Sequence, residues 1–159
     1  MESRNYLEAL IQGLKKKKEV LDKIIEKNLE QKELLMTEEP GLDEWEVLIQ
    51  KKAECIEELN HLDTGFQEVY NRVKDELSVN REKYREEILK MQELIADITD
   101  RSVQIQAQEI RNKDLAQTQF ARMKRKTKTL RQNQRVANAY KQTMKRTNVV
   151  DPQFLDKNN

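Results

Sequence analysis

FQEVYNRVKDELSVNREKYREEILKMQELIADITDRSVQI, residues 66–105, is the stretch that decides the fold of this chain. Its apolar side chains recur at intervals of seven, at Tyr70, Leu77, Tyr84, Met91, Ile98 and Ile105. Five consecutive seven-residue steps indicate helices that pack as coiled coils. A continuous helix over these residues would span about 60 Å. Its stripe needs cover from other helices, because each fully buried Leu or Ile contributes about 1.5–3 kcal/mol.

The segment nearest the N-terminus predicts a first covering helix. Asn5 and Glu8 have the spacing of a capping box, and apolar residues then recur at helical intervals. We expect this helix to end near Thr37, because Pro40 disfavours helical geometry at the residue before it and Gly41 frees the backbone just beyond.

A second, shorter helix is predicted from Asp43, which has Glu46 three residues later as another candidate capping box, to about Leu62. Residues 63–65 then offer a turn or a kink, although a single Gly costs a helix only about 1 kcal/mol and the helix can continue. Together these segments predict an all-α fold, an elongated antiparallel bundle of helical hairpins with coiled-coil packing and an amphipathic helix at the C-terminus.

Composition supports this fold class. The 159 residues are 37% charged and 36% hydrophobic, with 5% aromatics, 3 Gly and 2 Pro, which excludes a β sandwich or a Rossmann-type fold. A single cysteine cannot form an intramolecular disulfide, and no apolar run follows Met1 or approaches the roughly 20 residues of a membrane span. We therefore expect a soluble, cytoplasmic protein.

Charge divides the chain into three parts. Residues 1–114 carry 19 Lys or Arg and 27 Asp or Glu, and form the predicted acidic helical body. Residues 115–150 carry ten basic residues and no acidic ones. Residues 151–159 are expected to form a flexible end. An acidic body joined to a basic segment can fold back on itself or hold that segment ready for an acidic partner.

The basic segment 115–150 also carries a thin apolar line. We predict that these side chains bind a partner helix: Phe120, Met123, Leu130, Ala137, Tyr140 and Met144. So narrow a face buries too little to order the segment alone. The segment must therefore dock on the body, dimerise or wait for a partner.

The sequence contains few residues that could form a catalytic or metal-binding site. His61 and Cys55 are the only residues of their types, so a zinc site of thiolates and imidazoles cannot be built within one chain. Six residues apart on one helix, they lie on different faces, which argues against a nucleophile and its base. The three glycines are far apart and form no phosphate loop. We predict no enzyme activity, no cofactor and no metal.

The layout of the chain resembles flagellar export chaperones of the FlgN type. The resemblance rests on QKELL at residues 31–35, on the acidic break that follows, and on LDEWEVLI at residues 42–49 leading into IEEL at residues 56–59. A long coiled helix and a C-terminal helical segment complete it. FliT-type chaperones have a similar sequence pattern in the region that corresponds to residues 42–62, so the resemblance does not distinguish the two types.

The resemblance implies a cytosolic chaperone that holds the helical termini of late flagellar substrates, chiefly hook-associated proteins, unpolymerised until export. It implies that the C-terminal helical region binds the substrate. It also implies contact with the cytosolic domain of the export gate through a tyrosine near the C-terminus, a position that falls on Tyr140 here.

Two alternatives remain open from sequence. The chain could be a structural coiled-coil or scaffold protein that forms a homo-oligomer through the seven-residue stripe. It could instead be a nucleic-acid-binding accessory protein that uses its basic segment. Only Phe120 and Tyr140 are aromatic in that segment, too few for a stacking platform, which argues against nucleic acid.

Overall fold

The computed structural model describes residues 2–130 and 140–145, and nearly all of them are helical. Three long helices follow one another: α1 (Glu2–Leu35), α2 (Leu42–Val79) and α3 (Arg85–Leu130). The described part of the chain contains no strand. The predicted all-α class is confirmed.

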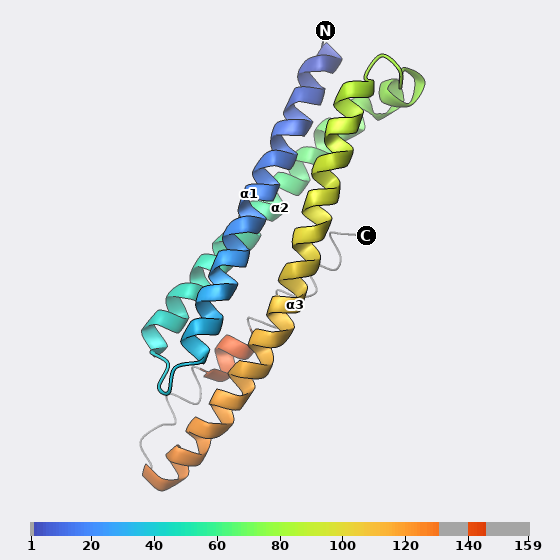
Figure 1. Ribbon diagram of the computed structural model, residues 1–159. Coiled ribbons are helices and arrows are strands. Elements are labelled where there is room, and N and C mark those ends of the chain that lie inside the picture. Colours follow the sequence, from blue (N-terminus) through green and yellow to red (C-terminus); the bar gives the residue numbers. More distant parts are fainter. Residues whose placement is uncertain (1, 131–139, 146–159) are drawn as a thin grey trace.

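The helices form an elongated bundle in which α1 holds the other two together (Figure 1). α1 and α3 run in the same direction and α2 runs opposite to both. α1 packs against α2 and against α3, whereas no Cα of α2 lies within 8 Å of a Cα of α3, although both helices are described throughout. We call the end with loop 36–41 the loop end and the end with residues 80–84 the turn end. A gap between α2 and α3 therefore faces away from α1.

The predicted continuous helix over residues 66–105 is wrong, because the chain reverses at residues 80–84. Asn80 ends α2, and its backbone N–H still donates to the carbonyl of Glu76. Leu77 and Tyr84, on either side of the turn, are buried in the same apolar cluster. Reversal lets both halves of the stripe pack against α1, whereas one straight rod would leave much of its stripe in water. A seven-residue interval cannot reveal a turn that preserves the interval.

The predicted helix starts also need correction. α1 already begins at Glu2, so Asn5 and Glu8 lie inside the helix and form no capping box. The N-cap of α2 is Gly41, which has no side-chain cap. Asp43 lies in the first turn instead, where a carboxylate is favourable next to the positive end of the helix dipole.

The helix ends are closer to expectation. α1 ends at Leu35, two residues before the predicted limit at Thr37. α2 does not stop at residues 63–65 but continues to Val79, with the Thr64 hydroxyl donating to the carbonyl of Asn60 at 3.0 Å. The continuation is the outcome that the low cost of one Gly allowed.

Two apolar clusters form the core. The larger one, nearer the turn end, includes Leu7, Leu10, Leu14, Val20, Leu21, Ile24, Ile56, Leu59, Val73, Leu77, Tyr84, Met91, Leu94, Ile98 and Ile105. The smaller one, at the loop end, consists of Leu34, Leu35, Trp45, Ile49 and Ala116. Buried polar residues lie between them, chiefly Asn28, Lys52, Gln108, Glu109 and Asn112. The bundle thus has two apolar cores rather than one continuous seam.

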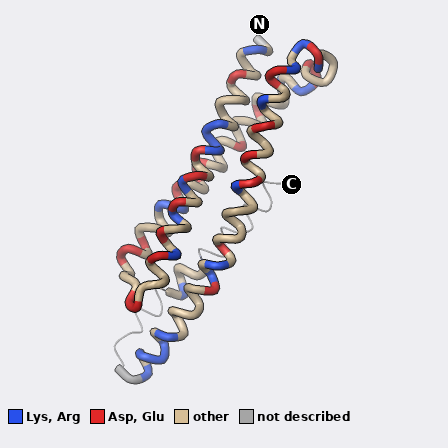
Figure 2. Tube along the Cα trace, viewed as in Figure 1, with Lys and Arg blue, Asp and Glu red and all other residues tan. Residues whose placement is uncertain are grey.

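The charge boundary at residues 114 and 115 falls inside α3, which crosses it without a break. Figure 2 shows basic residues along the end of α3 that projects beyond loop 36–41. None of the helices in the described ranges is long and apolar enough to cross a membrane. The predicted end at residues 151–159 lies outside the described residues.

Candidate functional site: the groove between α2 and α3

The gap between α2 and α3 forms an apolar groove toward the turn end. Its walls are Phe66 and Tyr70 on α2 and Ile88, Met91 and Ile95 on α3. Two hollows, of about 600 and 420 Å³, share Phe66 and Ile95 and so form one continuous feature. We call it the α2–α3 groove. It exists because α1 covers only one side of the α2 and α3 stripes.

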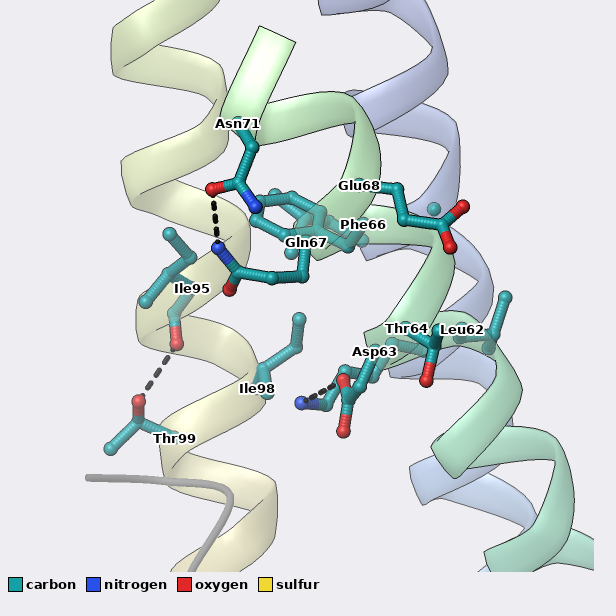
Figure 3. A pocket seen from close by; sticks show the side chains of 13 residues that line it. Leu62, Asp63, Thr64, Phe66, Gln67, Glu68, Asn71, Ile95, Ile98 and Thr99 are labelled. Carbon is teal, nitrogen blue, oxygen red and sulfur yellow. Dashed lines mark hydrogen bonds and ion pairs between the residues drawn. The ribbon is translucent and has the colours of Figure 1, made fainter. Parts of the chain in front are cut away.

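Figure 3 shows the first of these hollows, with side chains of α2 and α3 facing each other across it. Ile98 lies at its buried side and is 4% exposed, whereas Ile95 is 47% exposed. Phe66 and Tyr70 stack on each other with ring centroids 6.1 Å apart. A surface of this kind, apolar inside and partly wet, can accept the apolar face of an amphipathic helix.

Polar groups border the groove and are tied down locally. Gln67 donates to Asn71 at 2.9 Å, and the Thr99 hydroxyl donates to the carbonyl of Ile95 at 2.9 Å. Lys17 of α1 bonds to Asp63 of α2 at 2.9 Å. These bonds hold the rim in place without closing the apolar interior.

A buried ion pair connects α2 and α3 where the groove ends. Lys52 Nζ of α2 lies 2.5 Å from a carboxylate oxygen of Glu109 on α3, and both side chains are at most 1% exposed. The same ammonium group donates to Gln31 on α1 at 3.0 Å, and Gln31 also accepts from Asn112 at 3.4 Å. Charges this deeply buried are tolerated only when they are paired and hydrogen-bonded. The pair therefore acts as a fixed strut across the gap.

Beyond the strut, the chain's own residues 140–145 fill the gap with a short helical turn (Figure 1). The Tyr140 ring is 1% exposed and stacks on Trp45 of α2, with centroids 6.4 Å apart and planes at 12°. On its other side lies Phe120 of α3, also with centroids 6.4 Å apart. Met144 packs against the loop-end cluster. Burial raises the pKa of the Tyr140 hydroxyl, although the nearby Arg122 lowers it in part.

The structure brings together three of the predicted partner-binding residues: Phe120, Tyr140 and Met144 meet at the loop end. They pack against the chain's own bundle, so among the three outcomes left open for residues 115–150, docking on the body is the one observed for residues 140–145. Met123 is half-buried on α3. Leu130 is the last residue of α3 and its side chain is not described, and Ala137 lies outside the described residues.

Two features of the site were not predicted from sequence. One is the stack of Trp45 on Tyr140, which joins residues that lie 95 positions apart. Phe66 and Ile95 belong to the stretch 66–105, for which coiled-coil packing was predicted, yet they line an open groove. The sequence does contain an indication of the groove. The apolar stripe of residues 66–105 is wide, and it contains more apolar residues than one covering helix can bury.

Charged side chains elsewhere mainly tie α1 to α3. Lys18 bonds to Asp97 at 2.9 Å and Arg101 bonds to Asp22 at 2.7 Å. The hydrogen bond from Lys18 is the main cause of the lowered pKa of Asp97. Burial raises the pKa of the Cys55 thiol, which keeps it protonated and weakly nucleophilic. Among the described residues, no group of three or more His, Cys, Asp or Glu is placed to hold a metal ion.

Comparison of the chain with family models, curated proteins and solved structures finds no match.

Proposed function

We propose that this protein is a non-catalytic, cytoplasmic chaperone of flagellar type III export that binds helical termini of hook-associated proteins. The observation that carries the proposal is the gap between α2 and α3. One end of it already holds an amphipathic helical turn of the chain itself, and the other end presents an open apolar groove.

The groove suits a helical client for physical reasons. Phe66, Tyr70 and Ile95 offer separate apolar contacts along the walls, as required by a helix that inserts anchors at successive turns. Met91 adds an unbranched side chain that adapts to different partners. A client helix bound in the groove would be unable to pair with other copies of itself. Preventing such pairing before export is the task of an export chaperone.

The proposed contact with the export gate involves Tyr140, and the structure sets a condition on it. The ring is 1% exposed between Trp45 and Phe120. It can reach another protein only after residues 140–145 leave the loop end. We therefore propose that gate contact and docking of this segment exclude each other.

A pull-down from full-length protein tests the client site. Ile95→Asp places a charge in the groove and should reduce retention of hook-associated proteins at least about tenfold, because a helix docked there would bury an unpaired carboxylate. Val103→Asp is the matched control, since Val103 is also on α3, is 61% exposed and does not line the groove.

Equal retention by the two variants and the unchanged protein would remove the groove from the client site. Retention of duplex or single-stranded nucleic acid, weakening steeply as salt is raised, would favour the nucleic-acid alternative instead.

A further inference from the structure

A second apolar hollow lies between α1 and α2 at the loop end. Its apolar surface comes from Leu34 on α1 and from Val47 and Leu48 on α2, and its volume is about 570 Å³. Val47 is 51% exposed although it is a large apolar residue. Among the described residues this apolar surface is therefore left open, and we call it the loop-end hollow.

The rim of the loop-end hollow indicates what kind of surface would cover it. Four carboxylates surround the apolar floor: Glu30, which pairs with Lys27 at 3.2 Å, and Glu33, Asp43 and Glu44. Residues 26–46 as a whole contain eight acidic residues against two basic ones. An apolar floor with a rim of a single sign of charge favours a partner that brings apolar contact together with cations.

The chain itself carries such a surface at the same end of the bundle. The Gln119 side chain of α3 donates to the carbonyls of Leu35 and Thr37, which marks the level where α1 ends. The remaining 11 residues of α3, 120–130, run about 16 Å farther. Figures 1 and 2 show this extension projecting beyond loop 36–41. It carries five basic residues, no acidic residue and the half-buried Met123.

The extension does not cover the hollow of its own molecule. Every residue that lines the loop-end hollow belongs to α1, α2 or the loop between them. Lys126 of the extension pairs with Glu39 of this loop at 3.5 Å, and Glu39 does not line the hollow. In the described part of the chain, the extension and the hollow thus lie at the same end of the molecule, and no residue of the extension lines the hollow.

We propose that a second copy of this chain covers the loop-end hollow, with the basic extension of α3 from each copy seated on the acidic hollow of the other. A two-fold axis at the loop end forms both contacts at once, since each copy contributes one hollow and one extension. The net charge of +1 at pH 7 leaves little overall repulsion between copies. This inference is independent of the client site proposed above.

Sedimentation of the full-length protein at about 0.05 M and about 0.5 M salt tests the proposal, because exposed ion pairs are screened at the higher ionic strength. We expect a dimer at low salt whose dissociation constant rises at least about tenfold at high salt. The variant E33K/E44K should dissociate at least about tenfold more readily, and so should K124E/K128E, because each turns attractions into repulsions.

A mixture of the two charge-reversed variants provides the decisive measurement. At a protein concentration just high enough for the unchanged protein to dimerise, each variant alone should be mainly monomeric. The mixture should form a dimer with about one copy of each, because the reversed charges again match. The control E54K/E57K reverses two exposed carboxylates of α2 that do not line the hollow, and should dimerise like the unchanged protein. Helical circular dichroism checks that each variant folds.

A monomer at low salt, or a dimer that neither charge reversal weakens, overturns the proposal. Failure of the mixture to dimerise overturns it as well, because the pairing of these two surfaces would then not be the contact.

Discussion

The two ends of the gap between α2 and α3 differ in what fills them. At the loop end the gap holds the buried Lys52–Glu109 pair and the ring of Tyr140, which stacks on Trp45. Toward the turn end the walls include Phe66, Ile95 and Tyr70, yet Ile95 and Tyr70 remain 47% and 39% exposed. Both ends of the gap are formed by the same two helices, α2 and α3, packed on α1. The comparison therefore teaches that this packing alone does not decide whether the gap closes. Closure depends on the side chains that enter the gap, from α2 and α3 themselves at Lys52 and Glu109 and from residues 140–145 at Tyr140.

The largest effect is expected from removing one member of the buried Lys52–Glu109 pair, which helps to close the loop end of the gap. Lys52→Met should lower the free energy of unfolding by about 3–5 kcal/mol, because Glu109 is left as an unpaired charge in the interior. Chemical denaturation measures this loss. Lys51→Met, at the exposed neighbouring residue, is the control, and its free energy of unfolding should stay within about 0.5 kcal/mol of that of the unchanged protein.

Replacing both members tests the reason for that loss. The double variant K52M/E109M should recover most of the stability, since apolar pairs of similar volume often substitute for buried ion pairs without cost. A double variant no more stable than Lys52→Met would show that the cost comes from packing rather than from the unpaired carboxylate.

The docked segment 140–145 gives a smaller, local effect. Tyr140→Ala should reduce the opening free energy of this segment by about 2–3 kcal/mol, because the ring loses its contacts with Trp45 and Phe120. Hydrogen exchange of the amides in residues 140–145 measures it.

Tyr140→Phe is the matched control. Among the described residues, the Tyr140 hydroxyl is buried without a hydrogen-bond partner. Removing it should leave protection unchanged or slightly increased. If Tyr140→Phe lost as much protection as Tyr140→Ala, the hydroxyl rather than the stacked ring would hold the segment.

The open end of the gap should tolerate truncation better. Ile95→Ala should change the free energy of unfolding by less than about 1 kcal/mol, because its side chain is half-exposed. Ile98→Ala, three residues along the same helix and 4% exposed, should cost about 2–5 kcal/mol. Equal losses in thermal or chemical unfolding would mean that the groove is closed in solution.

The smallest effect concerns pH at the turn end, where Glu76 accepts hydrogen bonds from Ser3 and from Tyr84, the latter at 2.8 Å. These bonds lower the pKa of Glu76 below its ordinary value of 4.5. A lowered folded-state pKa means that this stabilisation is present above about pH 4.5 and is lost as pH falls through the folded value. Chemical denaturation at several acidic pH values should therefore show that the free energy of unfolding declines less steeply with falling pH in Glu76→Gln than in the unchanged protein. Identical slopes for the two proteins would contradict the assignment.

Particular residues show how far sequence reasoning carried. The helical stripes and the loop around Pro40 were predictable because they are local: side-chain periodicity and the geometry before proline act within a few residues. The reversal at Asn80 was not, because the interval from Leu77 to Tyr84 is seven whether or not the chain turns between them. The partner-binding set was predicted as an apolar line, but the packing of Tyr140 against Trp45 depends on a contact between residues far apart in sequence.

The sequence by itself determined that this protein is built from long helices with an acidic body and a basic C-terminal segment, since both properties follow from local periodicity and from counting charges. Only the tertiary structure decided that α2 and α3 both pack against α1 with a gap between them, that Lys52 and Glu109 bridge this gap, and that Tyr140 fills one end of it while the other stays open. These features depend on which helix faces which, and that choice is set by the burial of whole surfaces rather than by any local pattern.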